Sequence, residues 1–318
     1  MIRISGAGVL CYSHLPSGGL AILLGKEKET PGWRQGSNKW SSFSGKVDST
    51  EEACYGAARE FVEESLAVIP LVEGGNVPVT IDEITTLLSK DRDMSEGGGV
   101  LEVRRKAEEV EYRYFVYIRH IPYKDYSTIF KETRKQLLDL DGIFRAFQVC
   151  RKGTAGGCLP RCVFPGTRLS PVLVVVNFKL LSYGSTLQIT IHDETSGQND
   201  IIDVEISDSG RKEAETFAAA RDAVLSRLSN INDPILSHPA VVVNRLHGHV
   251  MGAFVKKSYL EKSEVRWWSL NDLEHTAANS RTSGRQASDS FRYYFLESVP
   301  LLATAVRRRA MEFEMMAT

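Results

Sequence analysis

A chain of 318 residues, 42% hydrophobic and 25% charged, has the composition of a globular protein and is long enough for one large domain or two ordinary ones. A net charge of −1 provides no overall basic field for nucleic acid, and no apolar run approaches the roughly 20 residues that span a bilayer. Five cysteines, an odd number, form no disulfide framework, so we expect a soluble protein of a reducing compartment, the cytoplasm or the nucleus.

The first 45 residues predict a β-hairpin followed by a further strand. Residues 7–12 and 20–25 are apolar runs, and the Pro-Ser-Gly-Gly sequence of residues 16–19 is typical of a turn between them. After a polar loop, residues 40–43 lead into Gly45, which we expect at the end of a strand.

Residues 50–66 predict an amphipathic helix. Ser49 followed by Glu52 is a capping-box pattern, which makes Ser49 the expected N-cap. The alanines of this stretch are good helix formers, and together with Phe61 they provide an apolar face that can pack on a sheet.

Three glutamates occupy one face of this predicted helix. Glu60, Glu63 and Glu64 stand at positions i, i+3 and i+4, so their side chains project together. Carboxylates gathered in this way repel one another unless a cation lies between them. Mg²⁺ and Mn²⁺ prefer such oxygen ligands, and Mg²⁺ commonly bridges carboxylates to substrate phosphates.

The stretch from residue 45 to residue 67 resembles the Nudix box, whose pattern is G-x5-E-x7-R-E-U-x-E-E-x-G-U with U apolar. The chain departs from the pattern at its end, where Leu66 replaces the glycine and Ala67 holds the last apolar place. The resemblance implies an α+β fold, the Nudix α/β/α sandwich with a mixed sheet. The matching residues are Gly45, Glu51, Arg59, Glu60, Phe61, Glu63 and Glu64.

The resemblance also implies an activity and its residues. Nudix hydrolases cleave a diphosphate linked to another group, so the chain is expected to be a diphosphohydrolase (pyrophosphatase) acting on a nucleoside diphosphate linked to another moiety, a small phosphate-containing substrate. Mg²⁺ or Mn²⁺ would be held by Glu60, Glu63, Glu64 and the backbone carbonyl of Gly45. Arg59, the fourth member of the expected catalytic set, would hold glutamates in place rather than touch the substrate.

Several points stay open at this stage. Trp40, the aromatic residue nearest the box, is a weak candidate for stacking on the substrate. The other aromatic candidates for stacking are Trp33, Tyr114 and Trp267. The candidates for a general base are carboxylates outside the box, namely Glu109, Glu111, Asp139 and Glu264.

Alternative functions share the same fold. One is a Nudix module that binds a nucleotide without cleaving it, which is less favoured because the chain keeps every glutamate of the box. Others are the hydrolysis of an RNA cap or of an inositol pyrophosphate. The net charge of −1 gives RNA no support as a partner. The oligomeric state stays open.

The middle of the chain interrupts the family pattern. Residues 89–109 are rich in charge and glycine, which is typical of a loop, whereas residues 111–120 predict a strand and residues 126–139 a helix. The pattern resumes only with a strand at 264–268, and a last helix is predicted at 291–309.

We therefore predict a discontinuous Nudix domain of residues 1–144 and 258–318, interrupted by a large α+β insertion of unknown role at 145–257. The loop predicted at 276–290 belongs to the Nudix part. Within the insertion, the expected elements are strands at 172–178, 187–192, 201–206, 240–244 and 250–255 and a helix at 211–228.

Overall fold

The chain divides by its internal contacts into two units, which are described separately. The first contains Met1–Glu132 and Ser258–Thr318, and the second contains Thr133–Lys257. The computed structural model describes residues 2–71, 80–93, 99–107, 109–151, 162–164, 174–180, 186–193, 197, 199–205, 238–240, 255–282 and 290–317.

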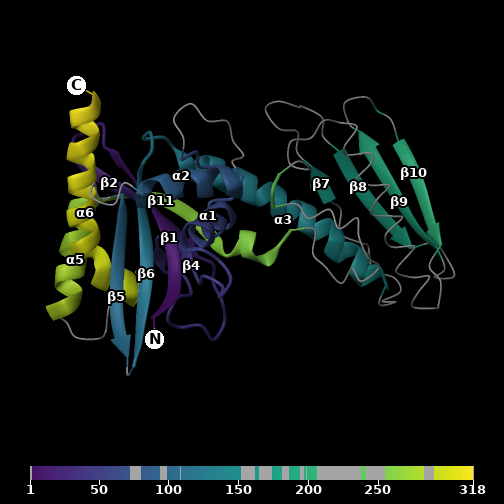
Figure 1. Ribbon diagram of the computed structural model, residues 1–318. Helices are drawn as coiled ribbons and strands as arrows, with labels where there is room; N and C mark the ends of the chain where they lie inside the picture. Colours follow the sequence, from purple (N-terminus) through teal and green to yellow (C-terminus); the bar gives the residue numbers. More distant parts are fainter. Residues whose placement is uncertain are drawn as a thin grey trace. The chain divides into compact units, whose positions relative to one another are not determined.

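The first unit is built on a mixed sheet of seven strands (Figure 1). The strand order is β11-β2-β1-β6-β5, with β3 paired to β2 and β4 paired to β1. Strands β1 and β6 run parallel, and the other pairs are antiparallel. The strands are β1 (Ile2–His14), β2 (Leu20–Glu27), β3 (Trp40–Ser41), β4 (Phe43–Gly45), β5 (Val100–Ala107), β6 (Val110–His120) and β11 (Lys262–Ser269).

Helices cover both faces of this sheet (Figure 1). Helix α1 (Ala53–Glu64) packs on β1 and β4 and is joined by α2 (Ile81–Asp93). On the other face, α5 (Leu270–Thr282) contacts β2 and β11, and α6 (Tyr293–Ala317) contacts β6. The predicted α+β class, a mixed sheet between helical layers, is confirmed for this unit.

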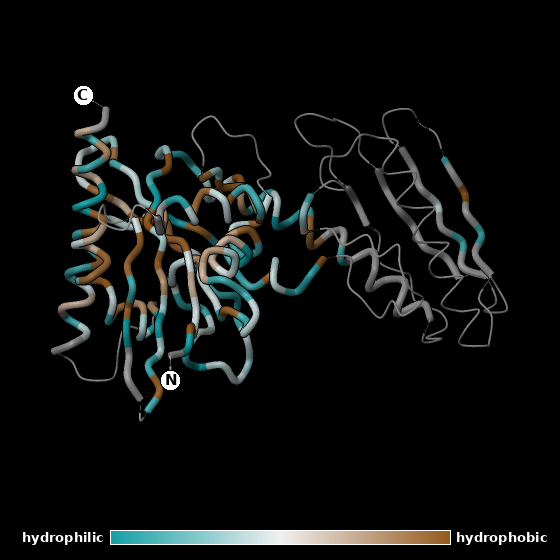
Figure 2. The backbone as a smooth tube through the Cα atoms, viewed as in Figure 1, coloured by the Kyte–Doolittle hydropathy of each residue, from teal (hydrophilic) through white to brown (hydrophobic). Residues whose placement is uncertain are grey.

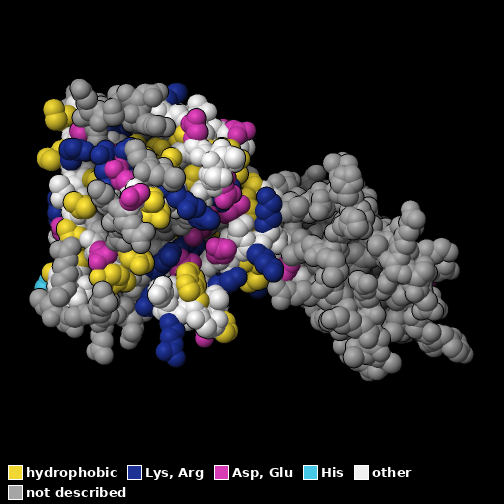
Figure 3. Space-filling view, turned by 60° about the horizontal axis from the view of Figure 1, so that its bottom comes forward, with side chains coloured by type: hydrophobic (Ala, Val, Ile, Leu, Met, Phe, Trp, Pro, Cys, Tyr) yellow, Lys and Arg dark blue, Asp and Glu magenta, His cyan; other side chains and the backbone are white. Residues whose placement is uncertain are grey.

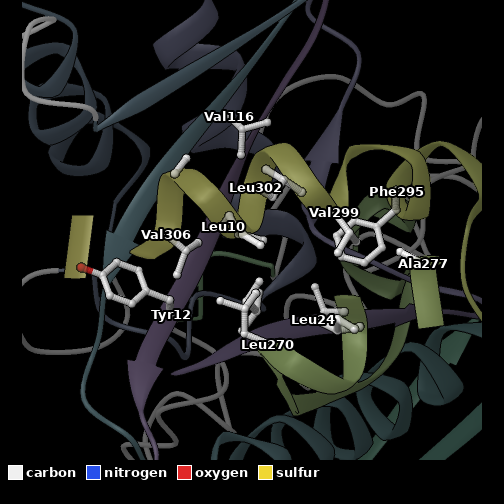
Figure 4. Close-up of a cluster of buried hydrophobic side chains, with 14 of the residues drawn as sticks. Leu10, Tyr12, Leu24, Val116, Leu270, Ala277, Phe295, Val299, Leu302 and Val306 are labelled. Carbon is white, nitrogen blue, oxygen red and sulfur yellow. The ribbon is translucent and has the colours of Figure 1, made fainter. Parts of the chain in front are cut away.

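The core follows from the alternation of side chains along the strands. Successive strand residues point to opposite faces, and in Figure 2 hydrophobic segments recur along the strands and helices of this unit. Toward α5 and α6, buried apolar side chains of β1, β2, β3 and β6 meet those of the two helices (Figure 4). Each such side chain contributes about 1.5–3 kcal/mol when fully buried. The cluster includes Leu10, Tyr12, Leu24, Val116, Leu270, Val299, Leu302 and Val306.

The N-terminal hairpin is confirmed. Strands β1 and β2 pair with Cys11 opposite Leu23, and the turn between them carries Gly18 and Gly19 at φ 89° and 86°. These positive angles cost glycine little because it has no Cβ. The predicted strand at 111–120 is confirmed as β6.

The predicted start of the first helix is wrong. Helix α1 begins at Ala53, its N-cap is Glu52, and no side chain caps it. Residues before it form a turn instead, in which the Glu51 N–H donates to the Asp48 carbonyl and the Glu51 carboxylate accepts the Asp48 N–H. The carboxylate of Glu51 also binds Arg59, and this local network replaces the expected capping box at Ser49.

The predicted loop at 89–109 is also wrong. Its first residues end α2, and residues 100–107 form β5, an edge strand paired with β6 along its whole length. Pairing with a strand already in place overrides a charged composition that, read alone, disfavours a strand. Residues 94–98, where the glycines gather, lie outside the described part of the chain.

Two predicted elements near the C-terminus are present with shifted bounds. The predicted strand at 264–268 is β11, which pairs with β2, and the predicted last helix is α6. A short 3₁₀ turn, η1 (Lys257–Leu260), precedes β11. Residues 276–282, predicted as loop, continue α5 instead.

The division between the units falls within α3 (Tyr126–Arg151), which is 12 residues longer than the helix predicted at 126–139. The second unit contains an antiparallel sheet in the order β10-β9-β8-β7. Three of its strands correspond to predicted ones, and the short β7 was not predicted. The bounds are β7 (Cys162–Phe164), β8 (Val174–Leu180), β9 (Thr186–Asp193) and β10 (Asn199–Glu205).

Other predicted elements of the insertion lie mostly outside the described residues. This holds for the helix at 211–228 and for nearly all of the strands at 240–244 and 250–255. Within those strands the structure describes Ala240, in a turn, and Val255, in an isolated bridge. Among the described helices, none is both long and apolar enough to cross a membrane.

Candidate functional site

Arg59 organises the carboxylates of α1. Its guanidinium donates two hydrogen bonds to Glu51, from Nε at 3.0 Å and from Nη2 at 3.1 Å. Nη1 donates to Glu60 at 2.8 Å and lies 3.6 Å from a carboxylate oxygen of Glu63. Nη2 also donates to the Lys46 carbonyl at 3.0 Å. One planar cation therefore ties three glutamates of the box to the strand-to-helix connection.

Strand β4 approaches α1 closely because it ends in glycine. A Cβ placed on Gly45 would lie 2.3 Å from the carboxyl carbon of Glu60, a separation that real atoms do not tolerate. One residue earlier, the Ser44 N–H donates to the Glu64 carboxylate at 2.7 Å. The backbone of β4 thus lies directly against two of the three predicted ligands.

A buried lysine completes the cluster. Lys262, at the start of β11, is fully buried, and its Nζ lies 2.6 Å from Oε1 of Glu27 and 3.1 Å from Oε1 of Glu64. The ammonium also donates to the hydroxyl of Ser41 at 3.0 Å. Arg292 reaches the same Glu27 oxygen at 3.3 Å. Both oxygens of Glu64 are consequently engaged, one by Lys262 and the other by a backbone N–H.

Neither Lys262 nor Glu27 was identified from the sequence. They come together because β11 pairs with β2 in a register that sets Lys262 opposite Glu27. A further carboxylate, Glu261, precedes β11, and its pKa is raised by partial burial and by the negative charges of Glu27 and Glu63. Only the pairing of β11 with β2 would have revealed this contact, and the spacing of residues along the chain does not show which strands pair.

Burial and neighbouring charges shift the pKa values of the glutamates in different directions. The hydrogen bonds from Arg59 hold the pKa of Glu51 below its usual range. Burial raises the pKa of Glu60, against the attraction of Arg59. Burial raises the pKa of Glu64 to about 8, opposed by Lys262 and reinforced by the negative charges of Glu27 and Glu60. Burial therefore disfavours the charged forms of Glu60 and Glu64, whereas the hydrogen bonds from Arg59 favour the charged form of Glu51.

The donor set suits a divalent cation of the Mg²⁺ type. Within the described part of the chain, no three His, Cys, Asp or Glu side chains are grouped so as to hold a metal by themselves. Mg²⁺, however, is usually bound through one or two carboxylates together with waters and substrate phosphates. Glu60 and Glu63 can supply those carboxylates, and the absence of a Cβ on Gly45 is what lets the Glu60 carboxylate lie against the backbone of β4. The residues therefore fit such an ion, with Glu64 already bound to a lysine.

A cavity of about 500 Å³ lies beside this cluster, over the sheet and under α6. It includes Ser44 and Gly45, the two residues that contact the glutamates, and Arg292, which contacts Glu27. Aromatic residues line its other walls. The residues relevant to the site are Ser42, Ser44, Gly45, Tyr114, Arg292 and Phe295.

The aromatic candidates are placed differently from one another. Trp40 is buried in the core, edge-to-face with Trp268 at 5.5 Å, and the Lys26 ammonium lies 6.0 Å from its ring centre. Tyr114 lines the cavity, and burial raises its pKa to about 12. Trp33 is 38% exposed, and the Arg292 guanidinium lies 5.5 Å from its ring centre. The indole of Trp267 donates to the Lys124 carbonyl.

The candidate general bases lie on different elements, two of them on the strands β6 and β11. Glu109 is in the turn after β5, Glu111 pairs with Arg113 at 2.8 Å, and Glu264 lies 3.8 Å from Lys131. None of these three is among the described residues that line the cavity. The side chain of Asp139 lies outside the described part.

The helix leaves the site through two residues in the left-handed conformation. Leu66, in the place of the usual glycine, has φ 56°, and Ala67 has φ 51°. The Ala67 N–H donates to the Val62 carbonyl at 2.9 Å, so the chain makes a helix-terminating turn without glycine. Both side chains are fully buried. Leu66 and Ala67 therefore carry the backbone strain of this helix end.

Comparisons with known proteins give partial likenesses. No protein-family model matches the chain, and no curated protein does. Among solved structures, a Nudix hydrolase from M. smegmatis, RenU, is similar at 18% identity and a TM-score of 0.25, over 39% of this chain and 64% of that one, slightly less than two thirds of its length.

Two crystal structures of the C. elegans Ap4A hydrolase, one of them a binary complex, are also similar. Each is 17% identical over 38% of this chain, with TM-scores of 0.21 for the complex and 0.20 for the other. The likeness covers 70% and 71% of those chains. At these scores the similarity carries no inference about activity, which has to be argued from the site.

Proposed function

We propose that this protein is a divalent-metal-dependent diphosphohydrolase that cleaves a nucleoside diphosphate linked to another moiety. The observation that carries the proposal is the arrangement of Glu60 and Glu63, which both contact Arg59. Glu60 also lies against Gly45, a residue that lines the 500 Å³ cavity. The match of these residues to the Nudix box gives the reaction class.

Each residue has a separate task in this proposal. Glu60 and Glu63 would hold Mg²⁺ or Mn²⁺, with the Gly45 carbonyl as a further ligand implied by the resemblance. When bound, such an ion supplies charge neutralisation for the phosphates and Lewis-acid activation. Arg59 keeps the carboxylates in a fixed geometry, and Glu64 is oriented by the Ser44 N–H and by Lys262.

The cavity would receive the group attached to the diphosphate. Aromatic walls and serine hydroxyls suit a flat or hydroxylated group better than a second cluster of phosphates. Arg292, at the boundary between the cavity and the acidic cluster, is the cation best placed to meet a phosphate oxygen.

The proposal extends to the organisation and compartment of the chain. Residues 1–144 and 258–318 would form the catalytic domain, with 145–257 inserted in it. Cys11 and Cys54 are free, buried thiols, which suits a reducing compartment such as the cytoplasm.

The direct test is a panel of nucleotide sugars, dinucleoside polyphosphates, inositol pyrophosphates and capped RNA, assayed by phosphorus NMR with Mg²⁺, with Mn²⁺ and with excess EDTA. We expect at least one substrate to be split at its diphosphate with either metal and none with EDTA. Binding of panel members without cleavage of any would contradict the enzymatic proposal and support a non-catalytic nucleotide-binding module.

A further inference from the structure

Glu64 is neutralised by a side chain of the protein itself. Lys262 is fully buried and lies 3.1 Å from one oxygen of Glu64, while the Ser44 N–H occupies the other oxygen at 2.7 Å. The same ammonium binds Glu27 at 2.6 Å. Glu27 has a second cationic partner in Arg292, whereas Lys262 is the only Lys or Arg for which the described residues show an ion pair with Glu64.

The other two carboxylates of the helix face are arranged differently. Glu60 and Glu63 interact with Arg59, on the side of the helix that leads to Glu51 and Lys46. Burying a carboxylate is costly unless a cation pairs with it. On this face two cations pair with different carboxylates. The guanidinium of Arg59 pairs with Glu60 and Glu63, and the ammonium of Lys262 pairs with Glu64.

We propose that Lys262 is a positioning residue that acts as a built-in cation, withholding Glu64 from a divalent ion and confining that ion to Glu60 and Glu63. The inference rests on the proposed function, because it assumes that the glutamate face receives a divalent ion at all. With Glu64 withheld, the site binds a divalent ion more weakly than a site with three carboxylates would, and the phosphates of the substrate complete the coordination. Removing the lysine should release Glu64 and create a three-carboxylate site.

The test is Mn²⁺ binding to substrate-free protein, measured from the electron paramagnetic resonance signal of free Mn²⁺. Lys262→Met keeps the length of the side chain and removes its charge. We expect this variant to bind Mn²⁺ more tightly than the wild type by about tenfold or more. A purely structural lysine would lower thermal stability on removal without tightening the binding of a metal.

Further variants keep the test decisive if Lys262→Met alone folds poorly. The double variant Glu27→Gln with Lys262→Met removes one charge of each sign and should fold while still releasing Glu64, so it should show the same gain. Glu27→Gln alone leaves Lys262 on Glu64 and should bind Mn²⁺ no more tightly than the wild type. Adding Glu64→Gln to either lysine variant should abolish the gain.

The outcomes separate this inference from the proposed function. If the wild type binds Mn²⁺ but the lysine variants bind it equally or less tightly, Lys262 does not withhold Glu64 and the inference is overturned. If the wild type neither binds Mn²⁺ nor cleaves any substrate of the panel, the proposed function fails and this inference fails with it. A gain that survives Glu64→Gln would also overturn it.

Discussion

Arg59 makes more polar contacts within the site than any other side chain described above. Its planar guanidinium places two donors on Glu51 and a third on Glu60, and a further contact reaches the Lys46 carbonyl. A lysine carries a single point of charge and cannot reproduce two parallel hydrogen bonds to one carboxylate. The arginine thus determines the position of the glutamates in addition to balancing their charge.

Arg59→Lys should therefore damage both activity and stability. Because hydrogen bonds between charged groups contribute about 1.5–3 kcal/mol each, we expect the free energy of unfolding to fall by about 1–3 kcal/mol. Turnover should fall by about tenfold or more. Urea denaturation and steady-state kinetics measure the two effects. Arg34→Lys, at an exposed loop position, is the matched control and should change neither.

Unchanged kinetics and unchanged unfolding in Arg59→Lys would show that the arginine does not hold the site together. A loss of stability without any loss of turnover would restrict its role to the fold of the segment between Glu51 and Glu60.

What could be predicted at this scale depended on distance along the chain. Residues 45–64 lie on one strand end and one helix, so their spacing alone placed the glutamates on a common face. The contact of Lys262 with Glu27 joins residues 235 positions apart. The register of β11 on β2 creates that contact, and no hairpin turn joins these two strands to make their register readable from the sequence.

At the scale of the element, the end of α1 shows how a departure from the pattern is accommodated. The helix terminates through Leu66 and Ala67, both with positive φ. The left-handed conformation costs a residue with a Cβ about 1–2 kcal/mol, which glycine avoids. Burial of the Leu66 side chain offsets this cost at its own position. At Ala67 the side chain is a single methyl, and little offsets the strain.

We expect Ala67→Gly to be tolerated and Ala58→Gly to be destabilising. Both alanines are fully buried, so each substitution loses one methyl group. Ala58 lies within α1, where glycine costs about 1 kcal/mol more than alanine, whereas Ala67 gains about the same amount from relief of its left-handed backbone. The two variants should differ by about 2 kcal/mol in free energy of unfolding, measured in urea.

Equal destabilisation by the two substitutions would mean that Ala67 is not strained in the native protein.

The helix, the hairpin and β6 were predictable because each has a strong local pattern. The capping box at Ser49 and the loop at 89–109 were mispredicted because side-chain bonding of Glu51 and pairing with β6 override local preference.

At the scale of the whole molecule, the late return of the chain to the first sheet is the main organising feature. Strand β11 is an edge of that sheet, and α5 and α6 cover one of its faces. The same return delivers Lys262 to the glutamates. On the face of the first unit shown in Figure 3, acidic and basic side chains are interspersed.

Deleting residues 145–257 and joining the ends with a flexible Gly/Ser linker should leave a folded protein that keeps metal-dependent hydrolysis, with altered substrate preference. Truncation after residue 144 removes β11, α5 and α6, exposes the apolar cluster of Figure 4, and should give an insoluble or unfolded product. Circular dichroism and thermal melting compare the two. A stable, active fragment 1–144 would refute the discontinuous domain and support two consecutive ones.

The strand and helix pattern after residue 258 predicts an insertion at 145–257. By its contacts the second unit ends at the same residue, Lys257, but begins earlier, at Thr133. The contact boundary at residue 133 lies inside α3, where a continuous helix carries no turn or glycine signal to mark it. The sequence left open whether the late strand pairs with the strand at 111–119 or with another strand of the sheet, and in the structure its partner is β2.

Glu63→Gln tests most directly whether the carboxylates held by Arg59 carry metal-dependent hydrolysis. Glu63 is suited to the test because it is not tied to Lys262, so the change removes one charge and leaves the buried lysine network in place. With the best substrate of the panel, saturating Mg²⁺ and the exposed Glu29→Gln as control, we predict that Glu63→Gln lowers turnover by about 100-fold or more without loss of the fold. Full turnover by Glu63→Gln would contradict the account.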